Sequence, residues 1–271
     1  MDNRPVGVFD SGLGGLTAAR KIRSILPSED IIYFGDTSRV PYGGRSREIL
    51  LKYARQDVRF LRSFDIKAIV VACGTVSTTC LPQLQAENEL PVLGVVEPAC
   101  RRAVAVSKTR HVGLIATAAS VRSGRYEQII HALDPDVTVT ARACPLFVPL
   151  VENGRYERGD VVIETVAREY LEPIRGSGID TLILGCTHYP LLMDLIGEIM
   201  GPEVTLIDTG EEAAWELKRT LKAKDILSDC AQEGTTTLYA SDQPEDFGSM
   251  AKHFLQEELT SPVLQVNIDR Y

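Results

Sequence analysis

The sequence predicts an α/β protein with two pseudo-symmetric lobes, each built on a mainly parallel sheet. Short β-rich apolar runs alternate with segments of helical period, and this alternation is typical of parallel strands that helices cover on both faces. Two stretches of the first half, "RPVGVFDSGLGG" and "AIVVACGT", also have echoes in "RHVGLIATAASVRSG" and "TLILGCTH" in the second. With about eight strands, two related α/β lobes are therefore favoured over one very wide sheet.

The predicted elements follow each other in a regular order. Strands are expected at residues 6–9, 31–34, 68–72, 92–95, 112–115, 137–141, 181–184 and 204–207. Helices are expected at residues 16–26, 46–64, 124–133, 161–174, 189–200 and 211–222. We expect the first lobe to comprise residues 1–97 and 210–271 and the second to comprise 98–209, with the active site in the cleft between them.

Composition and charge exclude several classes of function. A net charge of −8 argues against a nucleic-acid partner, since phosphate binding needs clustered Lys and Arg. No apolar stretch is long enough for a membrane span, and the N-terminus has no basic start followed by an apolar segment, so it is not a signal peptide. The six cysteines are scattered without a CxxC pair, which favours reduced thiols in the cytoplasm over disulfides or a zinc site.

The loops at strand ends carry the candidate site, because ligands of open α/β sheets bind beyond the carboxyl ends of the strands. The first is "VFDSGLGGLT", which resembles a dinucleotide-binding loop, with Asp36 near the place of a ribose-binding acid. Its third glycine is missing, so this interpretation is weak. Asp10 or Ser11 is either a helix N-cap or part of a site that favours an anionic group at a helix N-terminus.

Two further loops are ambiguous by themselves. Pro41 and Gly43 in "FGDTSRVPYGG" make an irregular turn that is either a plain β-turn or a segment that reaches over a site. Thr117 and its neighbouring serines follow the strand at 112–115, and they could line a site or cap a helix.

A pair of strand-end cysteines changes the interpretation. One free cysteine usually packs as a small apolar residue, but Cys73 and Cys186 stand in echoing contexts with Thr75 and Thr187 close by. His188, two residues after Cys186, shares its side of an extended chain. If the lobes face each other, the two thiols suit chemistry that removes a proton from one face of a carbon and returns one to the other.

The motifs "FDSGLGGLT", "FGDTSRVPYG", "VVACGTVS", "GVVEPA" and "LILGCTHYPLL", in this order, resemble those of the glutamate racemases of the aspartate/glutamate racemase superfamily. The resemblance extends from residue 6 to about residue 210. It implies interconversion of L- and D-glutamate for peptidoglycan synthesis, with no cofactor and no metal. It also implies a cytoplasmic enzyme that is commonly a homodimer.

The resemblance assigns roles to individual residues. Cys73 and Cys186 become the two acid/base thiols, assisted by Asp10 at the first and by His188 and Glu152 at the second. The substrate-holding positions that it implies are Asp10, Ser11, Pro41, Tyr42, Gly43, Gly74, Thr75, Thr117, Thr187 and His188. Gly74 departs from the family pattern, which commonly has Asn there, so one side-chain amide contact is in doubt.

The chemistry is plausible for ordinary thiols. A thiol with a pKa of about 8.5 is only a few per cent ionised at pH 7, and forming its thiolate costs roughly 2 kcal/mol. Most of the stabilisation must then come from hydroxyl and N–H groups, such as those of Ser11, Thr75 and Thr187, directed at charge on the substrate.

Other functions stay open at this point. A related enzyme could act on aspartate or another small dicarboxylate. A cysteine hydrolase could use Cys186 and His188, but it would leave Cys73 unexplained. A pair of binding lobes could hold a solute without catalysis, although the missing signal peptide counts against this. No sequence feature demands pyridoxal phosphate.

Overall fold

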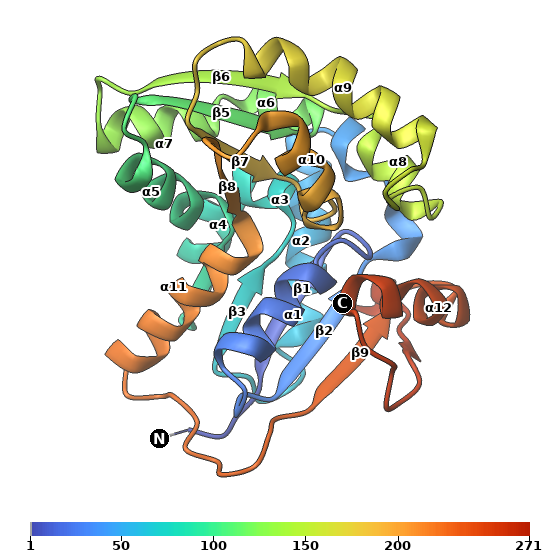
Figure 1. The fold of residues 1–271 in the computed structure, drawn as a ribbon. Coiled ribbons are helices and arrows are strands. Elements are labelled where there is room, and N and C mark those ends of the chain that lie inside the picture. The colour runs from blue at the N-terminus through green and yellow to red at the C-terminus, as the bar shows by residue number, and fades with distance from the viewer. Residues whose placement is uncertain (1) are drawn as a thin grey trace. The chain divides into compact units, whose positions relative to one another are not determined.

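The computed structural model describes residues 2–271, and the chain divides into two compact units. The first comprises the described residues up to Val95 together with Gly210–Tyr271, and the second is Val96–Thr209. The ribbon in Figure 1 shows that each unit is a parallel sheet with helices packed against it.

The sheet of the first unit has six strands in the order β10-β9-β2-β1-β3-β4, and all of its strand pairs are parallel. Its strands are β1 (Val6–Asp10), β2 (Ile31–Gly35), β3 (Ala68–Val71), β4 (Val92–Gly94), β9 (Thr236–Ala240) and β10 (Leu264–Gln265). The tail contributes β9, which pairs with β2 along its whole length.

The sheet of the second unit has four parallel strands in the order β6-β5-β7-β8. They are β5 (His111–Ala116), β6 (Thr138–Ala143), β7 (Thr181–Gly185) and β8 (Thr205–Asp208). This order repeats the β2-β1-β3-β4 core of the first sheet, strand for strand. The echo between the two halves of the sequence therefore corresponds to a repeated topology.

All eight predicted strands are present, with ends within two residues of those expected. The expectation of about eight strands was wrong for the tail, where β9 and β10 were missed. β9 begins with two threonines in "TTLYA", and β10 is only two exposed residues long, so neither has a long apolar run.

Five further helices lie where their periodicity predicts them. They are α1 (Leu16–Ile25), α2 (Arg47–Leu61), α7 (Arg125–Leu133), α9 (Val161–Arg175) and α11 (Thr209–Ala223). The helix expected at 189–200 is a 3-10 turn, η3 (Tyr189–Leu192), that continues as α10 (Met193–Met200). In the part of the chain that the structure describes, no helix is both long and apolar enough to cross a bilayer.

Several helices were not predicted, and most of them are too short to show a period. They are α3 (Gly74–Thr79), α4 (Leu81–Ala86), α5 (Val96–Val106), α6 (Ala118–Ser123), α8 (Phe147–Glu152) and α12 (Pro244–Leu255). Three further 3-10 turns are η1 (Thr37–Arg39), η2 (Tyr42–Gly44) and η4 (Ile268–Arg270). Short helices after β3 and β5 begin in polar stretches that the sequence suggested were loops, and α8 follows β6.

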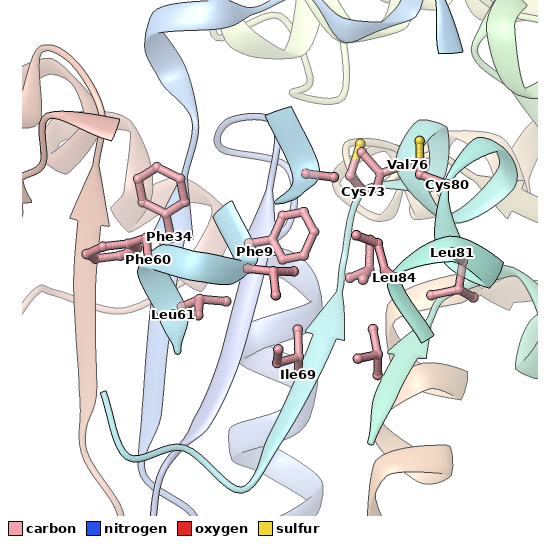
Figure 2. Packing of buried hydrophobic residues seen from close by; sticks show 14 of the residues in the cluster. Phe9, Phe34, Phe60, Leu61, Ile69, Cys73, Val76, Cys80, Leu81 and Leu84 are labelled. Atoms are coloured by element: carbon pink, nitrogen blue, oxygen red, sulfur yellow. The ribbon is translucent and has the colours of Figure 1, made fainter. Parts of the chain in front are cut away.

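A continuous hydrophobic core fixes the strand ends of the first unit. Phe9 of β1 and Phe34 of β2 pack with helix α2, whose Phe60 lies with its ring centroid 4.9 Å from that of Phe34. Figure 2 shows this cluster continuing past Ile69 of β3 to Cys73, which lies beyond the end of the strand. The sulfur of Cys73 is therefore held by the core at the carboxyl edge of the sheet.

Candidate active site

The strand order locates one candidate position in each sheet. The chain leaves β1 toward β2 on one side and leaves β3 toward β4 on the other, so β1 and β3 flank a switch point. Ligands of open α/β sheets bind at such points, beyond the carboxyl ends of the strands. β5 and β7 flank the equivalent point of the second sheet. Cys73 follows β3 and Cys186 follows β7, so the two thiols occupy equivalent places.

The first thiol site consists of Asp10, Ser11, Cys73 and Thr75. Cys73 is 4% exposed, and its Sγ lies 3.6 Å from the Ser11 Oγ. Asp10 ends β1 with a buried carboxylate, whose Oδ2 accepts a hydrogen bond from the Gly12 N–H at 3.0 Å. The site thus combines a thiol, a hydroxyl and a carboxylate on two neighbouring strand ends.

The chain turns sharply into α3 directly after Cys73. The Ser77 N–H donates to the Cys73 carbonyl at 2.9 Å, and the Ser77 hydroxyl donates to the Val71 carbonyl at 3.0 Å. Gly74, expected in a loop, is instead the buried first residue of this helix. Thr75 is also buried, one residue further along. The thiol is therefore positioned by helix geometry and not by a flexible loop.

A close approach of backbone holds Asp10 in place. Asp10 and Ser11 are not helix N-caps, contrary to one expectation, because α1 begins only at Leu16 after Gly15. A Cβ added at Gly15 would lie 2.5 Å from the Asp10 Cβ and 2.9 Å from the Tyr33 Oη. Real Cβ atoms do not approach other atoms so closely, so only glycine fits there.

Tyr33 is a site residue that the sequence did not indicate. Its buried hydroxyl donates to the Gly12 carbonyl at 2.8 Å, which fixes the loop after Asp10. Burial, Asp10 and Cys73 together raise the pKa of Tyr33 well above its usual range, so the hydroxyl stays protonated. Nothing marks this tyrosine in the sequence, because it lies inside an apolar strand.

Burial makes Cys73 a much weaker acid than a free cysteine. Burial and the nearby Asp10 raise the pKa of Cys73 to about 12, although hydrogen bonds from Val76 and Ser11 partly oppose this. Forming the thiolate at pH 7 then costs about 7 kcal/mol and not the roughly 2 kcal/mol expected for an ordinary thiol. Without a ligand, Cys73 is a protonated thiol that is suited to donating a proton.

The second thiol site consists of Glu152, Cys186, Thr187 and His188. The His188 Nδ1 lies 3.8 Å from the Cys186 Sγ, and its Nε2 lies 2.9 Å from the Glu152 Oε1. His188 is buried, whereas the Glu152 side chain is 39% exposed at the end of α8. The imidazole therefore bridges the thiol to a carboxylate that reaches solvent.

The electrostatics of this second site differ from those of the first. Burial alone would lower the pKa of His188, but hydrogen bonds to Cys186 and Glu152 outweigh it and raise the pKa to about 10. The ring is therefore an imidazolium at neutral pH. A cation beside the Cys186 Sγ stabilises negative charge on that sulfur.

Cys144 is a neighbour of the second site that sequence reasoning missed. It follows β6 directly, and its carbonyl accepts a hydrogen bond from the Tyr189 hydroxyl at 3.0 Å. Burial raises the pKa of Cys144 to about 12, and the charge of Cys186 contributes to this shift. The predicted strand ended at residue 141, which hid the strand-end position of this cysteine.

Of the two remaining threonine candidates, one lies beside a thiol and the other caps a helix. Thr187 is buried next to Cys186. Thr117 acts as the N-cap of α6, where its Oγ1 accepts from the Ser120 N–H at 3.3 Å. The helix-cap alternative therefore holds for Thr117, which still lies beyond β5 at the switch point.

The loop with Pro41, Tyr42 and Gly43 presents its backbone and not its aromatic hydroxyl. The buried Tyr42 hydroxyl donates to Asp36 and lies 3.3 Å from the Asp57 Oδ2. Asp36 is itself fully buried, so it is not a ribose-binding acid. Pro41 is exposed, and Gly43 is half-buried with open space around its Cα.

The described residues give no indication of a metal or disulfide centre. Among residues 2–271, no three His, Cys, Asp or Glu side chains gather as they would around a metal ion. All six cysteines are free thiols, and only Cys230 is exposed.

Comparison with known proteins gives a consistent answer. The family model for Asp/Glu/hydantoin racemases matches residues 20–217. A glutamate racemase of Geobacter metallireducens is 44% identical over 269 residues, which cover 99% of this chain and 98% of the relative. A glutamate racemase of Bacillus anthracis has a similar crystal structure, with a TM-score of 0.93, 37% identity and 98% of each chain covered. A Francisella tularensis glutamate racemase in complex with D-glutamate gives a TM-score of 0.91, with 38% identity and 100% of each chain covered.

Proposed function

The chain belongs to the Asp/Glu/hydantoin racemase family, and on this premise we propose that it interconverts L-glutamate and D-glutamate without a cofactor. The observation that carries the proposal is the pair of thiols, Cys73 and Cys186, at equivalent switch points of two sheets with the same strand order. The D-glutamate that it forms serves peptidoglycan synthesis.

In the proposed reaction the two thiols act on opposite faces of one α-carbon. A thiolate removes the α-proton, the C–H electron pair stays on the substrate as carbanion character, and the opposite thiol returns a proton to the carbon. Each turnover therefore exchanges the protonation states of Cys73 and Cys186. Asp10 and the Glu152–His188 pair reset these states by exchanging protons, which is general acid–base catalysis.

The surroundings of the two thiols favour one direction of this exchange over the other. Cys73 keeps its proton because its pKa is about 12, and His188 places a cation beside Cys186. Return of a proton from Cys73 matches its resting state, and the His188 cation stabilises the negative charge that Cys186 needs in order to remove the α-proton. The opposite direction needs negative charge on Cys73, which the ammonium group of the bound substrate stabilises.

The substrate is held by groups from both thiol sites and from the 41–43 loop. The Tyr42 hydroxyl is engaged with buried carboxylates, so we assign the peptide N–H groups of Tyr42 and Gly43 to a substrate carboxylate. The full set of proposed substrate contacts is Asp10, Ser11, Pro41, Tyr42, Gly43, Gly74, Thr75, Thr117, Thr187 and His188.

Chiral analysis of two substrates tests this proposal. Purified protein is incubated with L-glutamate or L-aspartate, without added cofactor, and the enantiomers are separated. Formation of D-glutamate at a kcat/KM far above that for aspartate supports the proposal. Preferential turnover of aspartate would favour the related dicarboxylate racemase, and acylated enzyme with no racemisation would favour the cysteine hydrolase.

We also propose that the enzyme works in the cytoplasm as a homodimer. Six free thiols support a reducing compartment. Light scattering coupled to size-exclusion chromatography measures the mass, which is twice 29.8 kDa for the dimer. Elution as a monomer at micromolar concentration would contradict the dimer but not the racemase activity.

A further inference from the structure

A buried polar network lies beneath the loop that we assign to a substrate carboxylate. We propose that this loop network, formed by Asp36, Arg39, Tyr42, Asp57 and Ser241, positions the peptide N–H groups of the 42–43 turn for substrate binding. The inference rests on the proposed function, and it gives positioning roles to side chains that do not touch the substrate, including the Tyr42 side chain, whose peptide N–H is the proposed contact.

Two carboxylates at the centre of the network join the loop to helix α2. Asp36 accepts a hydrogen bond from the Arg39 Nε at 2.6 Å and another from the Tyr42 hydroxyl. The Arg39 Nη2 also donates to the Asp57 Oδ1 at 2.8 Å, and the Tyr42 hydroxyl lies 3.3 Å from the Asp57 Oδ2. The Asp36 and Asp57 side chains are both 0% exposed. The middle and the end of the 36–42 segment, Arg39 and Tyr42, are thus tied to Asp57 of α2, and both are also tied to Asp36.

The segment after β9 holds the start of the same loop. The Ser241 hydroxyl donates to the Asp36 Oδ1 at 3.0 Å and accepts from the Ser38 N–H at 2.8 Å. Next to it, the Thr37 hydroxyl donates to the Asp242 carbonyl at 2.8 Å. The tail of the chain therefore fixes a loop that precedes it by about two hundred residues.

The turn itself has little packing of its own. A Cβ added at Gly43 or Gly44 would meet nothing within 4 Å, so the side of the turn where their side chains would lie is open. The Tyr42 side chain is buried beneath the turn, where its hydroxyl donates to Asp36. The Tyr42 ring packs in the hydrophobic core and against Tyr53, and the polar groups beneath the loop hold its hydroxyl, so this buried side chain orients the Tyr42 and Gly43 peptide groups.

The composition of the network also indicates that it positions the loop more than it stabilises the fold. Two buried carboxylates face one guanidinium, and an apolar cluster of similar volume would usually give equal or greater stability. The network contacts neither Cys73 nor Cys186 through any hydrogen bond described above, so its loss should weaken binding more than the proton transfers. The expected effect is a rise in KM with little change in kcat.

The experiment compares Tyr42→Phe with a matched control, Tyr53→Phe. The first substitution removes the hydroxyl from the network but keeps the ring and the peptide group. The second removes a hydroxyl outside the network, from a ring that lies 4.2 Å from the Arg39 guanidinium carbon. We expect Tyr42→Phe to raise the KM for glutamate about tenfold with kcat within about threefold, and Tyr53→Phe to change neither more than about twofold.

Ser241→Ala provides a second variant, because Tyr42→Phe could fail to fold. It removes the hydrogen bonds to Asp36 and Ser38 at the other end of the loop. We expect the KM for glutamate to rise here too, but by less than in Tyr42→Phe. An unchanged KM in the folded variants, or a fall in kcat alone, would overturn the inference. A wild-type protein that does not racemise glutamate would instead refute the proposed function.

Discussion

At Cys73, burial changes the chemistry that the residue type alone suggests. An ordinary cysteine would be partly ionised near neutral pH, but burial and Asp10 raise the pKa of this thiol to about 12. The pKa of His188 is also raised, to about 10, because Cys186 and Glu152 stabilise its charge. The same direction of shift therefore keeps Cys73 neutral and His188 charged. The two thiols therefore differ in their resting environments although they occupy equivalent positions.

Glu152→Gln tests the source of the charge on His188. Glutamine keeps the size of the side chain but removes the carboxylate charge, which is one cause of the raised pKa. We expect the pKa of His188 to fall by about one unit or more, which NMR titration of the ring C–H resonances measures. We also expect kcat to fall about tenfold or more, because proton exchange at Cys186 slows.

Glu157→Gln serves as the control for this prediction, since Glu157 is an exposed acid in the stretch that follows Glu152. Its substitution should leave both the His188 titration and kcat unchanged. An unshifted His188 titration in Glu152→Gln would show that the ion pair does not determine the charge of the ring.

Among the elements, the core strands could be predicted from the sequence, whereas the short helices could not. Continuous apolar runs identified all eight strands of the repeated cores, and helical period identified most of the long helices but missed α5 and α12. The short helices after β3, β5 and β6 escaped detection because six residues show less than two helical turns. Tertiary contacts alone bring three further residues to the thiol sites or to the loop network, and no local sequence pattern indicates such contacts. These residues are Tyr33, Cys144 and Asp57.

Gly15→Ala tests the close contact between the β1–α1 turn and the strand ends. A Cβ there would lie 2.5 Å from the Asp10 Cβ and 2.9 Å from the Ala72 Cβ, and neither Cβ can move without a shift of its own backbone. We expect a loss of about 1–3 kcal/mol in the free energy of unfolding, measured by urea denaturation. Gly44→Ala is the control, because it meets nothing within 4 Å. Equal stability of both variants would contradict the described turn.

The paired carboxylates beneath the 36–44 loop predict a pH dependence of stability. Burial and Asp36 raise the pKa of Asp57 in the folded protein well above its usual value. A raised pKa means that the folded state favours the protonated acid. The contribution of Asp57 to the free energy of unfolding is therefore largest below the unfolded-state pKa, and it is lost as pH rises through the folded-state pKa.

Asp57→Asn removes this titration while keeping the shape of the side chain. We expect its stability relative to wild type to increase with pH between about 5 and 8, by at most about 1.4 kcal/mol per pH unit. Urea unfolding at several pH values measures the difference. Asp65→Asn, at a side chain that is 84% exposed, should give a flat difference. A flat difference for Asp57→Asn as well would show that Asp57 is ionised in the folded protein.

For the whole molecule, the repeated sheet topology explains why a two-thiol reaction suits this chain. Strand order β2-β1-β3-β4 recurs as β6-β5-β7-β8, and the strand that carries the cysteine is the same one in both. The sequence echo indicated this repeat, but the strand orders and the switch points required the structure. The proton donors around each thiol differ between the units, which is consistent with two acid/base groups that work in opposite senses.

Racemisation of L-glutamate in deuterated water by wild type, Cys73→Ala and Cys186→Ala tests the two-thiol reaction most directly. Circular dichroism follows the loss of optical activity, and NMR follows deuterium at the α-carbon. We expect wild type to form D-glutamate that carries α-deuterium, each variant to lower kcat by about a thousandfold or more, and the exposed Cys230→Ala control to keep full activity. Near-wild-type racemisation by either Cys73→Ala or Cys186→Ala would contradict the account.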